Sequence, residues 1–340
     1  MIAPTTVTAG SGCGPTTGYA LPTVTAWSTA RRTSPSRWRC GRRAPCATAS
    51  SLPPVPATGI PAAPERDVSM SSKIANPVSE LPYPLRDKRT LEAGQQFRFA
   101  CHPGLDCFTD CCANVNILLT PLDVLQLSRR LGLETGDFLR RHTLTPFTKE
   151  LQLPVVVLKM NDDEKKTCPF VGDQGCTVYQ ARPWSCRMYP LAMALPPARA
   201  GQEPEPMYFL FEDDFCHGHG QGQDWTVESW QANQGLAERD HLEEGFRRVV
   251  THPWFIGGRQ LDIRRMDMFY TACYDLDAFR RFVFDTTFLK RFEMEDELIE
   301  KLRSDDEELL QFAFRWLRFA LFAEPTMQVR PDAPASGRNP

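Results

Sequence analysis

The pattern of apolar and polar positions along the chain changes character near residue 222. Before that point the apolar positions form short runs, rich in β-branched and aromatic residues and separated by Gly, Pro and Asp. Runs of this kind are typical of short strands. We therefore predict strands at 115–120, 153–160, 176–179 and 207–211.

Two segments between these strands have the spacing and the boundary residues of helices. Leucines recur at helical spacing from Leu122 to Leu131, with Thr120 before the first turn and Gly132 after the last. Threonine caps a helix N-terminus and glycine a C-terminus, so a helix at 121–131 is expected. A second short helix is expected at 135–142.

After Gly222 the apolar positions recur at helical spacing to residue 322. The last stretch begins with a capping box at Ser304–Glu307 and has an amphipathic apolar face, and its Arg315 and Arg318 exclude a membrane-spanning helix. The expected helices are 226–230, 237–250, 263–274, 276–284, 295–302 and 304–322. The sequence thus predicts an α+β protein, with a small strand-and-loop core followed by a mainly helical domain at 223–325.

Residues 1–69 differ in composition from the rest of the chain. They contain ten Pro, two Leu and neither Lys nor Phe. So few large apolar side chains cannot offset the entropy of ordering, so we expect disorder. We interpret this segment as an over-extended start with Met70 as the real first residue, the alternative being a transit or linker segment. An extended lead-in at 70–96 and a flexible tail at 326–340 complete the predicted organisation.

Charge and hydropathy exclude several classes of partner. The formal net charge is −3 and the isoelectric point is near 6.1, with no basic patch. Nucleic acid and anionic membrane surfaces are therefore not expected as partners. The chain has no run of 18 apolar residues and no secretory signal pattern. We expect a soluble protein of the cytoplasm.

The candidate chemistry lies in the cysteines. Eight of the twelve fall within residues 101–216, inside a predicted metal-binding domain at 97–222. In a reducing compartment this density indicates a metal site more than disulfides, and it is too high for thiols that merely fill a core. The candidate ligands are Cys101, Cys107, Cys111, Cys112, Cys168, Cys176, Cys186 and Cys216.

Their spacing narrows the choice of metal. Simple zinc fingers separate paired cysteines by two to four residues, and here only Cys107 and Cys111 fit. The ferredoxin run is absent, and Asn114 occupies the third position of the radical-SAM pattern. The adjacent Cys111 and Cys112 side chains should diverge, and eight thiolates carry too much charge for one divalent ion. An iron–sulfur centre is therefore favoured over a single zinc, and one site or two are both compatible with the pattern.

The residues C-x3-CC, followed by CPF-x5-C-x-VY-x2-RP-x2-CR-x-YP, resemble the YkgJ-type cysteine cluster family over about residues 97–220. The first half departs from the family pattern, with intervals of five and three residues in place of two and two. The resemblance implies a zinc- or iron-chelating CxxCxxCC domain, and flagellin lysine N-methylase is similar to that family. No nucleotide or S-adenosylmethionine loop is present, so the methylase chemistry is not carried over and no catalytic residue is assigned.

Several residues near the cysteines allow two interpretations. Arg182 and Arg187 flank Cys186, either as parts of a surface turn or as cofactor-binding groups that offset thiolate charge and hydrogen-bond a cluster. His217 and His219 follow Cys216 in a glycine-rich segment, which we interpret as a solvated turn. Cys273 is interpreted as core packing.

Two main hypotheses for function follow, with a third beside them. In the first, the domain holds an iron–sulfur centre for electron transfer, redox sensing or support of a modifying activity. In the second, a structural zinc module orders a helical protein-interaction domain, whose aromatic residues bind a partner protein. The third is a modifying enzyme related to the methylase. The sequence alone does not decide whether the protein is an enzyme.

Overall fold

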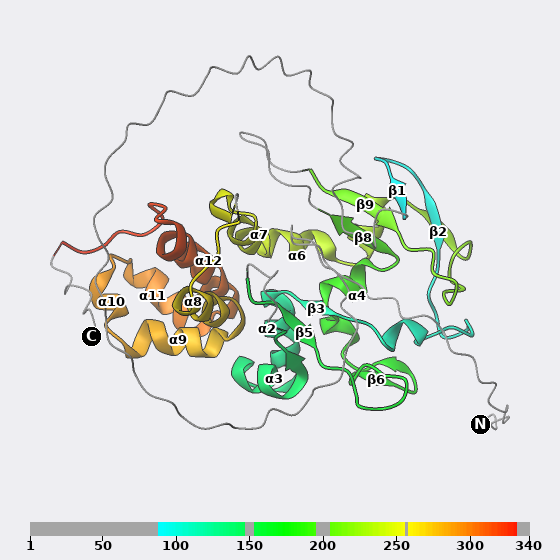
Figure 1. Ribbon diagram of the computed structural model, residues 1–340, viewed down its shortest axis with the longest axis horizontal. Coiled ribbons are helices and arrows are strands. Elements are labelled where there is room, and N and C mark those ends of the chain that lie inside the picture. Colours follow the sequence, from blue (N-terminus) through cyan, green and yellow to red (C-terminus); the bar gives the residue numbers. More distant parts are fainter. Residues whose placement is uncertain (1–87, 147–152, 195–204, 256–257, 332–340) are drawn as a thin grey trace, which may run out of the picture.

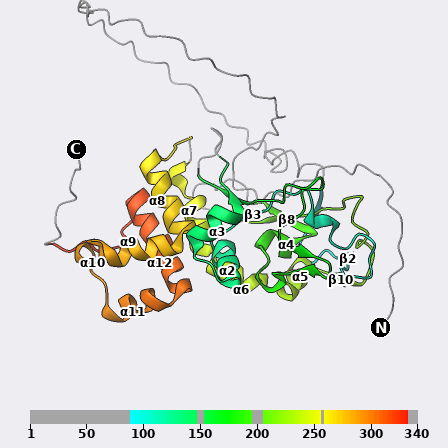
Figure 2. The same ribbon diagram turned by 90° about the horizontal axis from the view of Figure 1, so that it is seen from below.

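The computed structural model describes residues 88–146, 153–194, 205–255 and 258–331. The disorder expected for residues 1–69 lies outside these described residues, as do most of the lead-in and most of the tail. Within the described part, short antiparallel strands occupy residues 89–225 and helices dominate from 227 to 322. The predicted α+β class is confirmed. Figures 1 and 2 show the helices α8–α12 gathered at one end and the short strands at the other.

Two small sheets pair segments that are far apart in the chain. β1 (Arg89–Leu91), β9 (Met207–Leu210) and β8 (Leu191–Ala194) form an antiparallel sheet in the order β1-β9-β8. β2 (Phe97–Phe99) pairs with β10 (Gln223–Trp225). Only β9 was predicted, because strands of three or four residues with distant partners leave almost no periodic signal. The lead-in therefore enters a sheet, and the expectation of helix from residue 223 is wrong for β10.

The remaining strands surround the first helices. β5 (Val156–Leu158) pairs with both β3 (Leu118–Leu119) and β4 (Thr143–Leu144). β3 and β5 lie within two of the runs predicted to be strands, at 115–120 and 153–160. β6 (Val171–Gly172) and β7 (Gly175–Cys176) form a hairpin. The predicted strand at 176–179 is therefore wrong beyond Cys176, because the chain turns there into a short 3-10 helix, η3 (Tyr179–Ala181).

The two helices predicted at 121–131 and 135–142 are confirmed with the same bounds. α2 (Pro121–Leu131) begins at a capping box in which the Thr120 hydroxyl accepts from the Asp123 N–H, and Gly132 ends it with φ 67°. α3 (Thr135–His142) follows directly. A short helix, α4 (Trp184–Met188), carries the last cysteine of the second half of the motif.

The C-terminal half is helical, with differences at several boundaries. The single helix expected at 237–250 is two helices that meet at Glu243, and the last helix takes Asp305 rather than Ser304 as its cap. None of the helices in the described part of the chain is long and apolar enough to cross a membrane. The helices are α5 (Val227–Asn233), α6 (Leu236–Leu242), α7 (Glu244–Val250), α8 (Ile263–Tyr274), α9 (Leu276–Asp285), α10 (Phe288–Arg291), α11 (Asp296–Ser304) and α12 (Asp306–Phe322).

Two clusters of buried side chains position the cysteines. The large core combines α2, α3, β3 and β5 with α8, α9 and α12, so it draws residues from both sides of the predicted boundary at 222. The small core lies among β2, α4 and α5 and is built around Phe97, Phe99 and Trp230. Their rings meet edge to face, with centroids 6.1 Å apart for Phe97–Trp230 and 5.6 Å apart for Phe99–Trp230.

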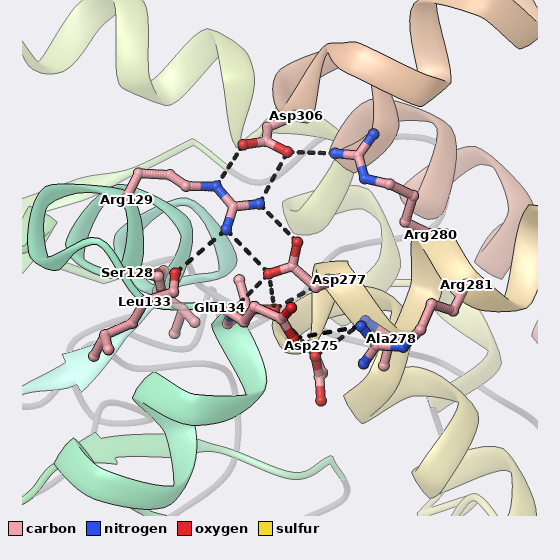
Figure 3. Close-up of polar contacts among 12 residues, drawn as sticks. Ser128, Arg129, Leu133, Glu134, Asp275, Asp277, Ala278, Arg280, Arg281 and Asp306 are labelled. Atoms are coloured by element: carbon pink, nitrogen blue, oxygen red, sulfur yellow. Dashed lines mark hydrogen bonds and ion pairs between the residues drawn. The ribbon is translucent and has the colours of Figure 1, made fainter.

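A polar junction joins α2 and α3 to the helical half (Figure 3). Arg129 of α2 donates to the Asp277 carboxylate at 2.9 Å and to the Asp306 carboxylate at 2.6 Å. The Thr135 N–H donates to Asp277 at 2.7 Å, and Arg280 also pairs with Asp306. Burial opposes ionisation of Asp277, but the hydrogen bonds from Arg129 and Thr135 outweigh it and lower the pKa of Asp277 to about 2.

Candidate metal centre

The adjacent cysteines lie in a single turn of 3-10 helix, η2 (Asp110–Cys112), between two residues with left-handed backbones. Thr109 precedes the turn with φ 77°, and Asn114 follows it with φ 53°. Positive φ is costly for a β-branched residue such as threonine, and such strain is found mostly where it holds functional groups in place.

The two halves of the cysteine motif are joined by backbone hydrogen bonds. The Cys168 N–H donates to the Cys112 carbonyl at 2.7 Å, and the Asn114 N–H donates to the Lys166 carbonyl at 2.9 Å. Ala113 and Thr167 form an isolated antiparallel bridge between these contacts. The protein backbone therefore brings Cys112 beside Cys168, although 55 residues separate them in the chain.

The other two cysteines of the second half lie on elements that are held from several sides. Cys176 ends the β6–β7 hairpin, where it pairs with Val171. Cys186 lies on α4, whose first N–H, that of Trp184, donates to the buried Asp123 carboxylate at 2.9 Å. The Trp230 indole donates to the Met188 carbonyl at the other end of α4, at 3.1 Å.

Four thiols form one interacting set, which we call the four-thiol set: Cys112, Cys168, Cys176 and Cys186. In each of the six pairs, a charge on one thiol would raise the pKa of its partner. Burial is the larger cause, and it raises the pKa of Cys168 to about 11 and that of Cys186 well above its usual value. Cys186 nevertheless keeps exposed surface.

Three further thiols form a second interacting set, the three-thiol set: Cys101, Cys107 and Cys216. All three pairs interact electrostatically. Cys216 packs against the small core, and burial raises its pKa while a hydrogen bond from Tyr189 opposes that rise. Cys101 is exposed. The structure thus places the eight predicted ligands in one region, where Cys168 lies in the large core and Cys216 packs against the small core.

Cys111 lies between the two sets, since it interacts with both Cys101 and Cys186. Its thiol also hydrogen-bonds to that of Cys112, so the expectation that the adjacent side chains diverge is wrong. The 3-10 turn and its left-handed flanks bring the two sulfurs together. This hydrogen bond raises the pKa of Cys111 and lowers that of Cys112, which makes Cys112 the more readily ionised of the pair.

His217 contributes more than the sequence suggested. Its Nδ1 lies 2.6 Å from the Asp106 carboxylate, and its backbone N–H donates to the Cys107 sulfur at 3.2 Å. Three side chains that could bind a metal converge here. One ligand atom each of Asp106, Cys107 and His217 lies within 4.8 Å of the other two, and no other such group of Cys, His, Asp or Glu is found in the described residues. Sequence reasoning did not single out Asp106. A recognisable signal was that Asp106 and His217 each adjoin a cysteine of the set.

His217 lies in an exposed turn, as expected, but the rest of this segment is paired with the end of β2. The Ala100 N–H donates to the Gly218 carbonyl at 3.1 Å, and the Gly220 N–H donates to the Arg98 carbonyl at 3.0 Å. His219 is half-buried, with its ring centroid 5.3 Å from that of Phe99. The glycines permit this close pairing with the end of β2.

Arg182 and Arg187 have different surroundings. Arg187 donates to the carbonyls of Arg182 at 3.1 Å and of Gln234 at 2.8 Å, and to that of Gln180. Arg182 is buried, donates to the Tyr179 carbonyl at 3.0 Å, and lies with its guanidinium 3.8 Å from the centroid of the Tyr179 ring. The positive charge of Arg182 opposes the burial that raises the pKa of Cys101 and Cys176. Arg182 can therefore offset thiolate charge on Cys101 and Cys176, whereas Arg187 stabilises the backbone around α4.

The comparison with family models supports the resemblance of the cysteine-bearing segment. Residues 100–217 match the CxxCxxCC family, described as a "Putative zinc- or iron-chelating domain". We call this matched segment the CxxCxxCC domain. No curated protein and no solved structure matches the chain significantly. The resemblance inferred from the motif is confirmed, and the CxxCxxCC domain includes all eight clustered cysteines.

The donor set of the CxxCxxCC domain suits the cofactors expected from the residues, an iron–sulfur cluster or zinc. Thiolates are preferred ligands of both. Because burial raises the pKa of most of these thiols, a metal would bind with release of their protons, and binding would be coupled to the local fold. Cys273 does not belong to the set: it is 1% exposed in the large core, as predicted.

Proposed function

We propose that the CxxCxxCC domain holds an iron–sulfur centre on the four-thiol set and works in the cytoplasm in electron transfer, redox sensing or support of a modifying activity. Of the eight candidate ligands, these four interact with one another in every pair. They also come from four separate elements that converge: η2, the turn before β6, β7 and α4.

The spacing of the sulfurs carries this proposal. No three cysteine sulfurs in the described part of the chain lie within 4.8 Å of one another. A tetrahedral zinc with metal–sulfur bonds of about 2.3 Å needs its four sulfurs roughly 3.8 Å apart. In a [4Fe–4S] cluster each thiolate binds a different iron, so the cysteine sulfurs stand further apart. Interacting thiols that do not crowd around one point therefore favour a polynuclear centre.

The chain contributes the surroundings of such a centre. A bound cluster would supply one-electron redox chemistry at a potential set by charge, hydrogen bonds and exposure. Arg182 contributes positive charge near Cys176, and Arg187 holds the turn before Cys186 through three carbonyls. Cys168 is buried, whereas Cys186 keeps exposed surface. An electron would thus reach the centre most directly from the Cys186 side.

One observation favours a second candidate function, a structural zinc module. Cys168 belongs to the large core, and Cys112 and Cys176 pack against it. A metal held by these thiols would brace α8, α9 and α12 for binding a partner protein. The third candidate, a modifying enzyme related to the methylase, has no comparable observation in its favour.

Anaerobic purification of the full chain tests the proposal. We expect brown protein with visible sulfur-to-iron charge-transfer absorption and equal amounts of iron and acid-labile sulfide. Replacing Cys186 by serine should remove colour and iron, whereas Cys273→Ser, buried in the large core, should keep both. A colourless wild-type protein with stoichiometric zinc would overturn the iron–sulfur proposal in favour of the zinc module.

A further inference from the structure

We propose that Asp106, Cys107 and His217 form a second metal site, for a single divalent ion of the zinc type, separate from the four-thiol set. This inference rests on the proposed function in one respect: the proposed centre uses the four-thiol set, which leaves Cys107 free to bind a second ion. The second site does not depend on which metal the four-thiol set binds.

Convergence of the three ligand atoms is the first argument. One atom each of Asp106, Cys107 and His217 lies within 4.8 Å of the other two, although 110 residues separate Cys107 from His217. The cysteines that dominate the motif show no such convergence in the described residues. The site therefore arises from tertiary structure and not from the spacing of the motif.

The donor chemistry is the second argument. A carboxylate oxygen, a thiolate sulfur and an imidazole nitrogen together suit a borderline ion such as Zn²⁺, which binds all three types. The His217 N–H donates to the Cys107 sulfur at 3.2 Å, which holds that sulfur beside the imidazole. Three protein ligands leave a fourth position of a tetrahedral ion open, as in catalytic zinc sites.

The backbone holds the two halves of the site together without a metal. The carbonyl oxygen of Gly218, next to His217, accepts a hydrogen bond from the Ala100 N–H at 3.1 Å. A Cβ at residue 218 would come within 2.4 Å of the Ala100 carbonyl oxygen, so only glycine allows this approach. Loop 216–218 is thus fixed against the segment that leads to Asp106 and Cys107.

Exposure sets this site apart from the four-thiol set. The side chains of His217 and Asp106 are 55% and 78% exposed. An ion at this position would exchange with solvent and be open to an added ligand. The neighbouring Cys101 and Cys216 interact with Cys107 electrostatically.

Cobalt(II) binding to the intact protein tests the inference, because Co²⁺ reports thiolate ligation through charge-transfer absorption. After dialysis against a weak chelator, the wild-type protein should bind one equivalent with a thiolate-to-cobalt band. His217→Gln and Asp106→Asn should weaken binding at least about tenfold, and Cys107→Ser should abolish the band. The matched controls His102→Gln and Asp214→Asn, exposed residues of the same two loops, should bind as the wild type does.

The iron and sulfide contents of the same samples separate this inference from the proposed function. They should be unchanged in His217→Gln and Asp106→Asn. If His217→Gln binds cobalt with the affinity and spectrum of the wild type, His217 and Asp106 are a surface ion pair only and the inference fails. It also fails if iron is lost together with cobalt, since that indicates a single centre. Wild-type protein without iron that still binds cobalt through His217 would overturn the iron–sulfur proposal and support the second site.

Discussion

The large core and the small core are stabilised in different ways. The large core is built from helices, the longest of which has 17 residues, and it buries rings from α8, α9 and α12 against α2 and α3. The small core joins strands of three or four residues around Trp230. Such short strands have little stability of their own. The small core therefore depends on specific contacts between distant segments, and the large core on the area that it buries.

The two sets of thiols follow the same division. Cys168 lies in the large core and Cys112 and Cys176 pack against it, whereas Cys216 of the three-thiol set packs against the small core. Loss of the metal from the four-thiol set should therefore act first on the side of the large core that these thiols contact. Changes in the small core should act first on the loops that carry Asp106, Cys107 and His217.

The largest effect is expected from Phe314→Ala in α12. Phe314 is 1% exposed and packs against Gly245 and the ring of Phe246, 5.9 Å away between centroids. Removing a buried ring from such a site costs about 3–5 kcal/mol of unfolding free energy. Denaturant unfolding measures it, and Phe282→Ala, 37% exposed, is the control with a smaller loss. Equal losses in both variants would contradict the description of the large core.

Gly218→Ala should have the next largest effect, and it acts on the small-core side. The added Cβ would meet the Ala100 oxygen at 2.4 Å and the Phe99 ring at 2.8 Å, so loop 216–218 must move. Overpacking of this kind costs about 1–3 kcal/mol. Cobalt affinity should fall with stability, while iron content stays unchanged. Gly220→Ala is the control, because a Cβ there would meet nothing within 4 Å, although its φ of 74° adds some strain. Wild-type cobalt binding in Gly218→Ala would show that the close approach is not needed.

The helices of the large core could be predicted largely from the sequence, because their signals are local. Thr120 and Gly132 mark the ends of α2, and leucine spacing marks its face. β1, β2, β8 and β10 could not be predicted in this way, since their pairing partners lie far along the chain. The break at Glu243 was also missed. Glu243 is buried and paired with Thr120, so tertiary contacts shape the backbone there.

The candidate site divides in the same way between local and distant information. The motif identified the eight cysteines and the metal-binding family, but it did not separate them into two sets. That separation depends on the backbone pairing of Cys112 with Cys168 and of Ala100 with Gly218. Both contacts join segments that are far apart in the chain, and no local sequence pattern indicates which segments will pair. The contact between His217 and Asp106 also joins distant segments, so it could not be predicted from the sequence.

A pH titration sharpens the description of the junction that joins the large core to α2. The pKa of Asp277 is lowered to about 2 in the folded protein, against about 3.9 for an unperturbed aspartate. A lowered pKa contributes stability that is present above about pH 4 and is lost as the pH falls through about 2. The contribution is about 2 kcal/mol. Asp277→Asn should therefore be less stable than the wild type at neutral pH by this amount or more. The difference should shrink below pH 4, whereas the exposed control Asp285→Asn should show no such trend. A difference that does not vary with pH would contradict the ionised pairing with Arg129.

Cys273→Ser should have the smallest effect, and it tests whether a cysteine of the large core differs in kind from the clustered ones. Cys273 is 1% exposed on α8, and burial alone raises the pKa of its thiol well above the usual value, with no contribution from another cysteine. Serine in its place buries a hydroxyl among apolar side chains, which should cost about 1–2 kcal/mol of unfolding free energy. The contents of iron, sulfide and bound cobalt should equal those of the wild type, because no ligand is lost. Cys186→Ser, measured beside it, should lose iron. If Cys273→Ser removes the metal while Cys186→Ser keeps it, the assignment of the ligands is wrong. If both keep it, Cys186 is not a ligand.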